Sequence, residues 1–185
     1  SYARLGTTAA RYAALFSGLV LFVGDRVALQ VENSPEALAI YLACLRGGFV
    51  FLPMNTAYRP DEVDYLVGNA EPGLVICDPS AEESTREIAA HHGTRHVLTL
   101  DADARGSFID AAAKVTDALP PAACGANDLA AILYTSGTTG KPKGAMLSHG
   151  NLASNGTAPA AYTHLRAHDT KADLVCRPSH EQTQL

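Results

Sequence analysis

The part of this sequence that most constrains its fold is a junction between an apolar run and a loop of small residues. The apolar run, residues 129–134, has the composition of a buried strand. Six small or hydroxylated residues follow at 135–140, and none of them offers an apolar side chain to a core. We therefore expect a strand that ends in a loop with an exposed backbone.

The composition of this loop is typical of an anion-binding site. Glycines permit backbone conformations with positive φ, so that successive N–H groups can turn toward one point. They lie at Gly137, Gly140 and Gly144. The hydroxyl donors are Thr135, Ser136, Thr138 and Thr139, and the positive charges belong to Lys141 and Lys143. Together these groups indicate a polyphosphate ligand. A plain surface turn is the alternative, but the run is too specific for it.

The loop does not follow the P-loop pattern of kinases and motor ATPases. That pattern would require a glycine at position 135 and a Ser or Thr at position 142, where this sequence has Thr135 and Pro142. Proline at 142 also prevents a helix from starting directly on the preceding lysine. We therefore expect a flap, rather than a helix N-terminus, to hold the phosphates.

Residues 134–144 resemble the signature loop of the adenylate-forming superfamily, whose pattern is Tyr-Thr-Ser-Gly-Thr-Thr-Gly-x-Pro-Lys-Gly. This superfamily contains acyl-CoA synthetases, peptide-synthetase adenylation domains and luciferases. Residues 24–28 and 33–36 also fit most of its members. Five further segments are similar to the malonyl-CoA synthetases in particular, and these are residues 52–58, 69–72, 77–80, 117–137 and 147–155.

The resemblance implies roles for the loop residues. Those that would bind the phosphates of ATP are Thr135, Ser136, Gly137, Thr138, Thr139, Gly140, Lys141 and Lys143. Thr135 would also lie nearest the magnesium ion. Lys143 would be the catalytic lysine, whereas Lys141 occupies a position that varies in the family. Tyr134 is expected to pack at the end of the strand rather than to take part in catalysis.

The resemblance also implies a reaction. A malonyl-CoA synthetase joins malonate to CoA through an acyl-adenylate, with release of AMP and pyrophosphate, and uses ATP, Mg²⁺ and CoA. Methylmalonate or a fatty acid is an alternative substrate, and a nucleotide-binding module without ligase activity is an alternative function. The family's adenine pocket, magnesium-binding glutamate and adenylation lysine would lie downstream, so we expect the 185-residue chain alone to be inactive.

Strand and helix patterns alternate along the chain before the loop. Strands are predicted at residues 26–31, 49–53, 74–77, 96–100 and 129–134, and helices at residues 35–46, 59–67, 82–91 and 107–115. An additional first helix carries Leu5, Tyr12, Leu15, Phe16 and Leu19 near helical spacing. This alternation predicts an α/β fold with a mostly parallel sheet and flanking helices. By resemblance, it is part of the large N-terminal domain of an adenylate-forming enzyme.

The helix at residues 35–46 has recognisable ends. Ser34 and Pro35 are typical of a helix start, and Gly47 and Gly48 are a plausible stop. Its apolar positions lie on one face and are Leu38, Tyr41, Leu42 and Leu45.

Composition argues against several classes of partner. The net charge of −5, with no basic patch outside the loop, argues against a nucleic acid. The most apolar run, residues 15–23, is under half of the roughly 20 residues that span a bilayer, so we expect no membrane anchor. The four cysteines lack zinc or disulfide spacing, which favours reduced thiols and a cytoplasmic protein. Small molecules are therefore the expected partners.

The character of the chain changes after Gly156. Residues 1–157 are predicted to form part of an AMP-binding N-terminal domain, with both ends of the parent protein missing. The remaining residues are polar and lack sustained periodicity, and residues 161–176 resemble the translation of a sequencing-library adapter. We expect residues 158–185 to be a non-native, disordered tail.

Overall fold

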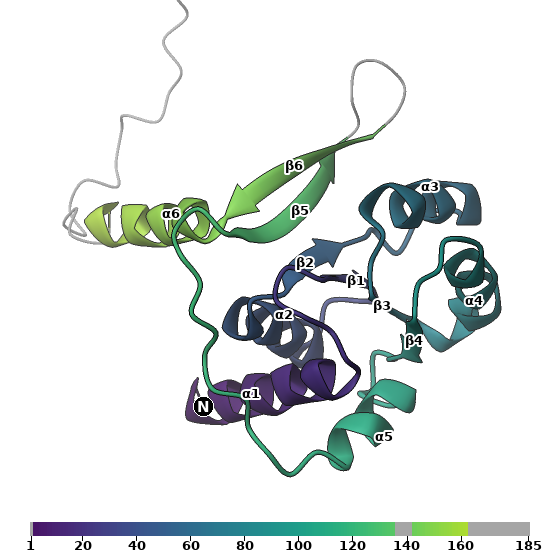
Figure 1. Ribbon diagram of the computed structural model, residues 1–185, viewed down its shortest axis with the longest axis horizontal. Helices are drawn as coiled ribbons and strands as arrows, with labels where there is room; N and C mark the ends of the chain where they lie inside the picture. Colours follow the sequence, from purple (N-terminus) through teal and green to yellow (C-terminus); the bar gives the residue numbers. More distant parts are fainter. Residues whose placement is uncertain (1, 136–141, 163–185) are drawn as a thin grey trace, which may run out of the picture. The chain divides into compact units, whose positions relative to one another are not determined.

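The computed structural model describes residues 2–135 and 142–162, with side chains up to residue 155 (Figure 1). The chain divides into two units, Ser1–Leu152 and Ala153–Leu185. Of the tail predicted to be disordered at residues 158–185, residues 158–162 are helical and the rest lies outside the described residues. Its non-native origin stays a prediction.

A six-stranded sheet forms the centre of the first unit. Its strands are β1 (Arg26–Gln30), β2 (Val50–Pro53), β3 (Leu74–Cys77), β4 (His96–Thr99), β5 (Leu129–Thr135) and β6 (Lys143–Ser148). They lie in the order β4-β3-β1-β2-β5-β6. The first five are parallel, and β6 is antiparallel to β5.

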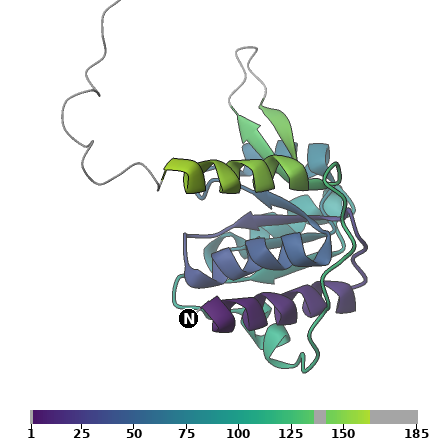
Figure 2. The ribbon, with the colours of Figure 1, turned by 90° about the vertical axis from the view of Figure 1, so that its left-hand side faces the viewer.

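Helices cover both faces of this sheet (Figures 1 and 2). On one face lie α1 (Tyr2–Gly18), α2 (Pro35–Gly47) and α5 (Ser107–Ala113). On the other lie α3 (Pro60–Ala70) and α4 (Glu82–His91), the latter preceded by the 3₁₀ turn η1 (Pro79–Ala81). Helix α6 (His149–Tyr162) follows β6. The predicted α/β fold with a mostly parallel sheet and flanking helices is confirmed, whereas strand β6 was not predicted.

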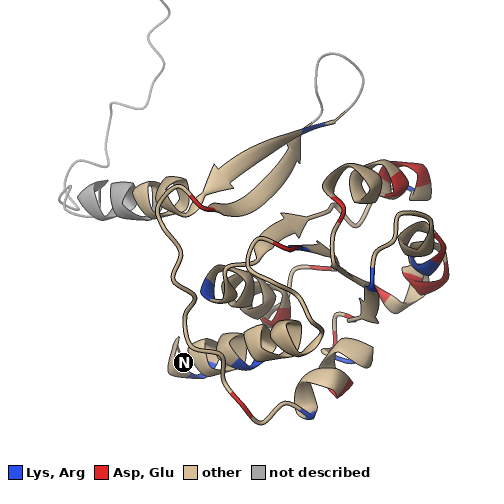
Figure 3. Ribbon diagram, in the orientation of Figure 1, with Lys and Arg blue, Asp and Glu red and all other residues tan. Residues whose placement is uncertain are grey.

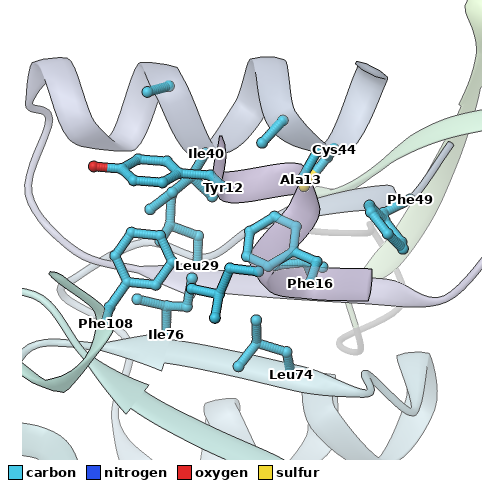
Figure 4. Packing of buried hydrophobic residues seen from close by; sticks show 14 of the residues in the cluster. Tyr12, Ala13, Phe16, Leu29, Ile40, Cys44, Phe49, Leu74, Ile76 and Phe108 are labelled. Carbon is cyan, nitrogen blue, oxygen red and sulfur yellow. The ribbon is translucent and has the colours of Figure 1, made fainter. Parts of the chain in front are cut away.

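Alternate residues of the central strands β1 and β3 point into two hydrophobic clusters, one on each face of the sheet. Leu29 of β1 and Ile76 of β3 pack with α1, α2 and α5, whereas Ala28 and Val75 pack against α3. Figure 4 shows the first of these clusters. Because both faces of the sheet are covered here, β3 and the interior of β1 are apolar instead of alternating with polar residues.

Aromatic side chains join α1 to the rest of its layer. The ring of Tyr12 meets Phe108 of α5 edge-on, with centroids 4.8 Å apart, and Phe16 meets Phe49 in the same way at 5.6 Å (Figure 4). The predicted first helix therefore docks through Tyr12 and Phe16. No helix in the described part of the chain is long and apolar enough to cross a membrane.

Helix α2 buries a different face from the one that carries its large apolar side chains. Its ends are as predicted: the Ser34 side chain accepts a hydrogen bond from the N–H of Ala37, and Gly48 ends the helix with φ +72°. The buried residues are Ala39, Ile40, Ala43, Cys44 and Gly47. Those on the predicted apolar face, Leu38, Tyr41, Leu42 and Leu45, are exposed or only half-buried. Helix α1 packs on α2, and small residues on that face allow the two helices to approach closely.

Candidate functional site

The predicted phosphate loop connects β5 to β6. Strand β5 pairs with β2 only through Ala131, opposite Phe51, and then continues beyond β2 as a hairpin with β6 (Figure 1). The last pair of the hairpin is Thr135 with Lys143. The loop therefore starts at the carboxyl end of a parallel strand, the edge where α/β sheets bind ligands.

Six of the predicted phosphate-binding residues lie outside the described residues. They are Ser136, Gly137, Thr138, Thr139, Gly140 and Lys141. Their roles, like those of Thr135 and Lys143, stay predictions.

The chain after the loop forms a strand rather than a helix. Strand β6 begins at Lys143, directly after Pro142, and the next helix starts only at His149. The described site therefore has no helix N-terminus adjoining the loop lysines, as the proline at position 142 predicted.

The two described site residues are both accessible. Thr135 and Lys143 are exposed, and Lys143 is the one basic residue within the described strands β5 and β6 (Figure 3). Because directly opposite residues of an antiparallel pair have their side chains on the same face, the hydroxyl and the ammonium group share one face of the hairpin. This face offers a hydroxyl and a positive charge to an anion.

The role predicted for Gly144 was wrong. It lies in the extended strand β6, opposite Tyr134, and its φ is not positive. A Cβ atom there would lie 2.9 Å from Cγ2 of Ile132 and 3.3 Å from Cζ of Tyr134. Position 144 therefore needs glycine for the close approach of two side chains of β5, and not for an unusual backbone conformation.

The side chain of Tyr134 is held by helix α3. Its hydroxyl donates a hydrogen bond to Oδ1 of Asn69. Its half-buried ring, together with Ile132, packs against the hydrophobic cluster between α3 and the sheet. Burial, and to a smaller degree the neighbouring Tyr65, raises the pKa of Tyr134 above its usual range. The hydroxyl therefore stays protonated at neutral pH and remains a donor.

A second contact joins α3 to the other side of the loop. The hydroxyl of Tyr65 donates to the carbonyl oxygen of Pro142 at 3.2 Å. The sequence interpretation missed both Tyr65 and Asn69 as part of the site. Their spacing of four residues, which puts two polar groups on one helix face, was the available signal.

A cleft of about 470 Å³ opens at the carboxyl ends of β1 and β3. Its polar lining includes Gln30, Glu32, Asp78, Ser80 and Thr85. The helices that follow these two neighbouring strands, α2 and α4, lie on opposite faces of the sheet, which is the usual position of a ligand crevice in such folds. None of the described loop residues lines this cleft.

Comparison with known proteins identifies the family. The model of the AMP-binding enzyme family matches residues 1–178. The chain belongs to the AMP-binding enzyme family. The resemblance predicted from the loop is thereby confirmed, and the α/β unit is part of the N-terminal domain of an adenylate-forming enzyme.

Two curated relatives of this chain are acid–CoA ligases by name. It is 35% identical to a feruloyl-CoA synthase of an Amycolatopsis species over 178 residues, which cover 96% of this chain and 34% of the relative. It is 31% identical to a crotonobetaine/carnitine–CoA ligase of Salmonella enteritidis, with 91% and 34% covered. The chain thus spans about a third of the length of these relatives.

A solved structure of the family shares both fold and sequence. The chain superposes on ATP-bound MatB from Rhodopseudomonas palustris with a TM-score of 0.84 and 54% identity. The match covers 88% of this chain and 32% of MatB.

Proposed function

We propose that the protein containing this chain is an ATP-dependent acid–CoA ligase that converts malonate, ATP and CoA into malonyl-CoA, AMP and pyrophosphate. The observation that carries the proposal is the 54% identity to ATP-bound MatB, a malonyl-CoA synthetase, over most of the chain. The signature loop at the carboxyl end of β5 supports the same reaction class.

The chemistry requires positive charge and donors at the phosphates. In an adenylate-forming reaction, a carboxylate attacks the α-phosphorus of ATP and pyrophosphate leaves. Both reactants are anionic, so donors fixed around the phosphates lower the barrier. In this chain the ammonium group of Lys143 and the hydroxyl of Thr135 lie on one exposed face at the base of the loop, where they would contact the β- and γ-phosphates.

The residues present are compatible with magnesium bound mainly by ATP. Mg²⁺ commonly takes one or two protein oxygens and fills its other positions with water and phosphate oxygens. Thr135 offers one hydroxyl, and the described residues contain no cluster of three or more acidic, His or Cys side chains. When bound, the ion would neutralise phosphate charge, and Thr135 would be its protein ligand from this chain.

Other acids are the main alternative. The named relatives include a feruloyl-CoA synthase and a crotonobetaine/carnitine–CoA ligase, so the reaction class is shared across different acids. Their identities of 35% and 31% are well below the 54% to MatB, which favours malonate. Methylmalonate and fatty acids stay on the list of substrates to test, as does ATP binding without ligation.

We also propose that this chain supplies only part of the active site and is inactive on its own. It spans 32% of MatB, and its adenylate-forming relatives are about three times as long. Small molecules would be its partners. The described cysteines are free thiols, which agrees with action in the reducing cytoplasm.

The test is product identity with the full-length protein. Malonate, methylmalonate, a medium-chain fatty acid, ferulate and carnitine are each incubated with ATP, Mg²⁺ and CoA, and nucleotides and acyl-CoA are separated by chromatography. AMP, pyrophosphate and malonyl-CoA are expected with malonate. ADP as the product would refute the reaction class, whereas AMP with another acid preferred would refute only malonate.

A further inference from the structure

We propose that Tyr65 and Asn69 of helix α3 are positioning residues for Thr135 and Lys143, the described residues at the two ends of the phosphate loop. This inference rests on the proposed function, because it concerns how that function's ATP site is held in place. The two side chains hydrogen-bond to the two arms of the β5–β6 hairpin, one on each side of the loop.

The two hydrogen bonds lie next to the residues that would contact ATP. Asn69 accepts from the hydroxyl of Tyr134, which precedes Thr135 in β5. Tyr65 donates to the carbonyl oxygen of Pro142, which precedes Lys143 in β6. Helix α3 therefore contacts both arms of the hairpin at its loop end, beyond the single point where β5 pairs with β2.

The hairpin has little other support at this level. Leu133, on the face turned away from α3, is 38% exposed, and within the described sheet β6 is an edge strand. On the face toward α3, Ile132 and Tyr134 pack against that helix, whereas Met146, opposite Ile132, is 71% exposed. A two-stranded ribbon that projects from a sheet is marginally stable without such packing.

Anchoring of Tyr134 also decides which face receives the ligand. Successive side chains of a strand point to opposite faces, so a Tyr134 held on α3 directs Thr135 and its partner Lys143 away from α3. The absence of a side chain at Gly144 lets the Tyr134 ring lie close to the backbone of β6. The hydrogen bond from Tyr134 to Asn69 thus fixes the orientation of the two groups that would meet the phosphates.

Helix α3 is itself firmly attached to the sheet. Arg26 of β1 donates from Nε to the carbonyl of Ala70 and from a terminal nitrogen to the carbonyl of Glu71, each at 2.6 Å. These bonds satisfy carbonyls at the end of α3, one and two residues after Asn69. A fixed α3 holds Thr135 and Lys143 in place before ATP binds, which lowers the entropic cost of binding.

The experiment measures ATP binding and steady-state kinetics of the full-length protein. Tyr65→Phe and Asn69→Ala each remove one tether, and Tyr134→Phe removes the donor of the second. Asn69→Asp keeps the acceptor oxygen and tests for rescue. Tyr41→Phe is the matched control, because Tyr41 is a similarly half-buried tyrosine on the opposite face of the sheet, packed on Phe51.

Each single tether variant is expected to weaken ATP binding about threefold to tenfold, the usual effect of one hydrogen bond. KM for ATP should rise, KM for CoA and the melting temperature should stay constant, and Tyr41→Phe should match the wild type. The double variant Tyr134→Phe/Asn69→Ala should lose no more affinity for ATP than either single variant, because both substitutions remove the same hydrogen bond. Asn69→Asp should bind ATP better than Asn69→Ala.

The inference is overturned if the tether variants bind ATP as the wild type does, or if their loss follows a lower melting temperature and affects CoA equally. If the wild type binds ATP but activates no acid, and the tether variants still bind ATP more weakly, the ligase function fails while the positioning role stands. If the wild type does not bind ATP, both are wrong.

Discussion

Thr135 and Lys143 lie directly opposite each other as the last pair of the β5–β6 hairpin. Their Cα atoms are therefore about 4.5–5.5 Å apart, as in any antiparallel pair, and the loop between them must start and end at nearly the same point. The pair brings a hydroxyl and a positive charge together at the base of the loop.

Replacing Lys143 with alanine should strongly impair the full-length enzyme. The Lys143 ammonium group would stabilise the negative charge that develops on the phosphates in the transition state, so its loss should lower kcat/KM for ATP about 100-fold. Lys141→Ala should have a smaller effect, because the family resemblance gives the lysine at position 141 no fixed role. Lys114→Ala, at the end of α5, serves as the control. Pyrophosphate release is the measurement, and equal losses in the two loop variants would contradict the assignment.

Replacing Gly144 with alanine should disturb the hairpin. The new methyl group would lie too close to Ile132 and Tyr134, at a cost of about 1–3 kcal/mol in the free energy of unfolding. Gly6→Ala in α1 is the control, because its Cβ would meet nothing within 4 Å, and it should stabilise the protein by about 0.5–1 kcal/mol. Urea unfolding of both variants checks this. A neutral Gly144→Ala would show that Tyr134 moves freely.

Replacing Arg26 with methionine should destabilise the protein more than replacing Arg86 with alanine. Arg26 is partly buried and satisfies two carbonyls at the end of α3, so its loss should cost about 1–3 kcal/mol. Arg86 forms an exposed ion pair with Glu82, whose loss should cost less than about 1 kcal/mol. Thermal unfolding separates the two, and equal effects would mean that the carbonyls of α3 are satisfied by water.

Thiol alkylation should distinguish the cysteines. Burial raises the pKa of the Cys44 and Cys77 thiols, and both are inaccessible. Burial is also the main cause that raises the pKa of the Cys124 thiol, but this residue is partly exposed. A short iodoacetamide pulse at about pH 8 should label Cys124 before Cys44 and Cys77, as read by peptide mass spectrometry. Labelling of Cys44 in the folded protein would contradict its buried position.

The same thiols predict the direction of a pH effect on stability. Above the ordinary thiol pKa of about 8.5, the unfolded chain releases protons that the folded chain retains. The stabilisation by the protonated buried thiols is therefore fully present at neutral pH. The free energy of unfolding should fall as the solution becomes more alkaline. Replacing Cys44 with alanine should reduce this fall, and an unchanged slope would mean that other groups cause it.

Local sequence determined most of the elements of this protein. Apolar runs at residues 74–77 and 129–134, the cap at Ser34 and the stop at Gly48 act over a few residues, so the parallel α/β architecture could be predicted from them. The signature loop identified the family for the same reason, because its glycines, hydroxyls and lysines are contiguous in the chain.

Tertiary structure decided which groups surround that loop. The apolar residues of α2 permitted two faces, and packing of α1 on its small residues selected the face with Ala39 and Ala43. The need for glycine at position 144 arises from Tyr134 across the hairpin. The contacts of Tyr65 and Asn69 join residues 65 or more positions apart, and such contacts depend on how α3 and β5 pack rather than on either segment alone.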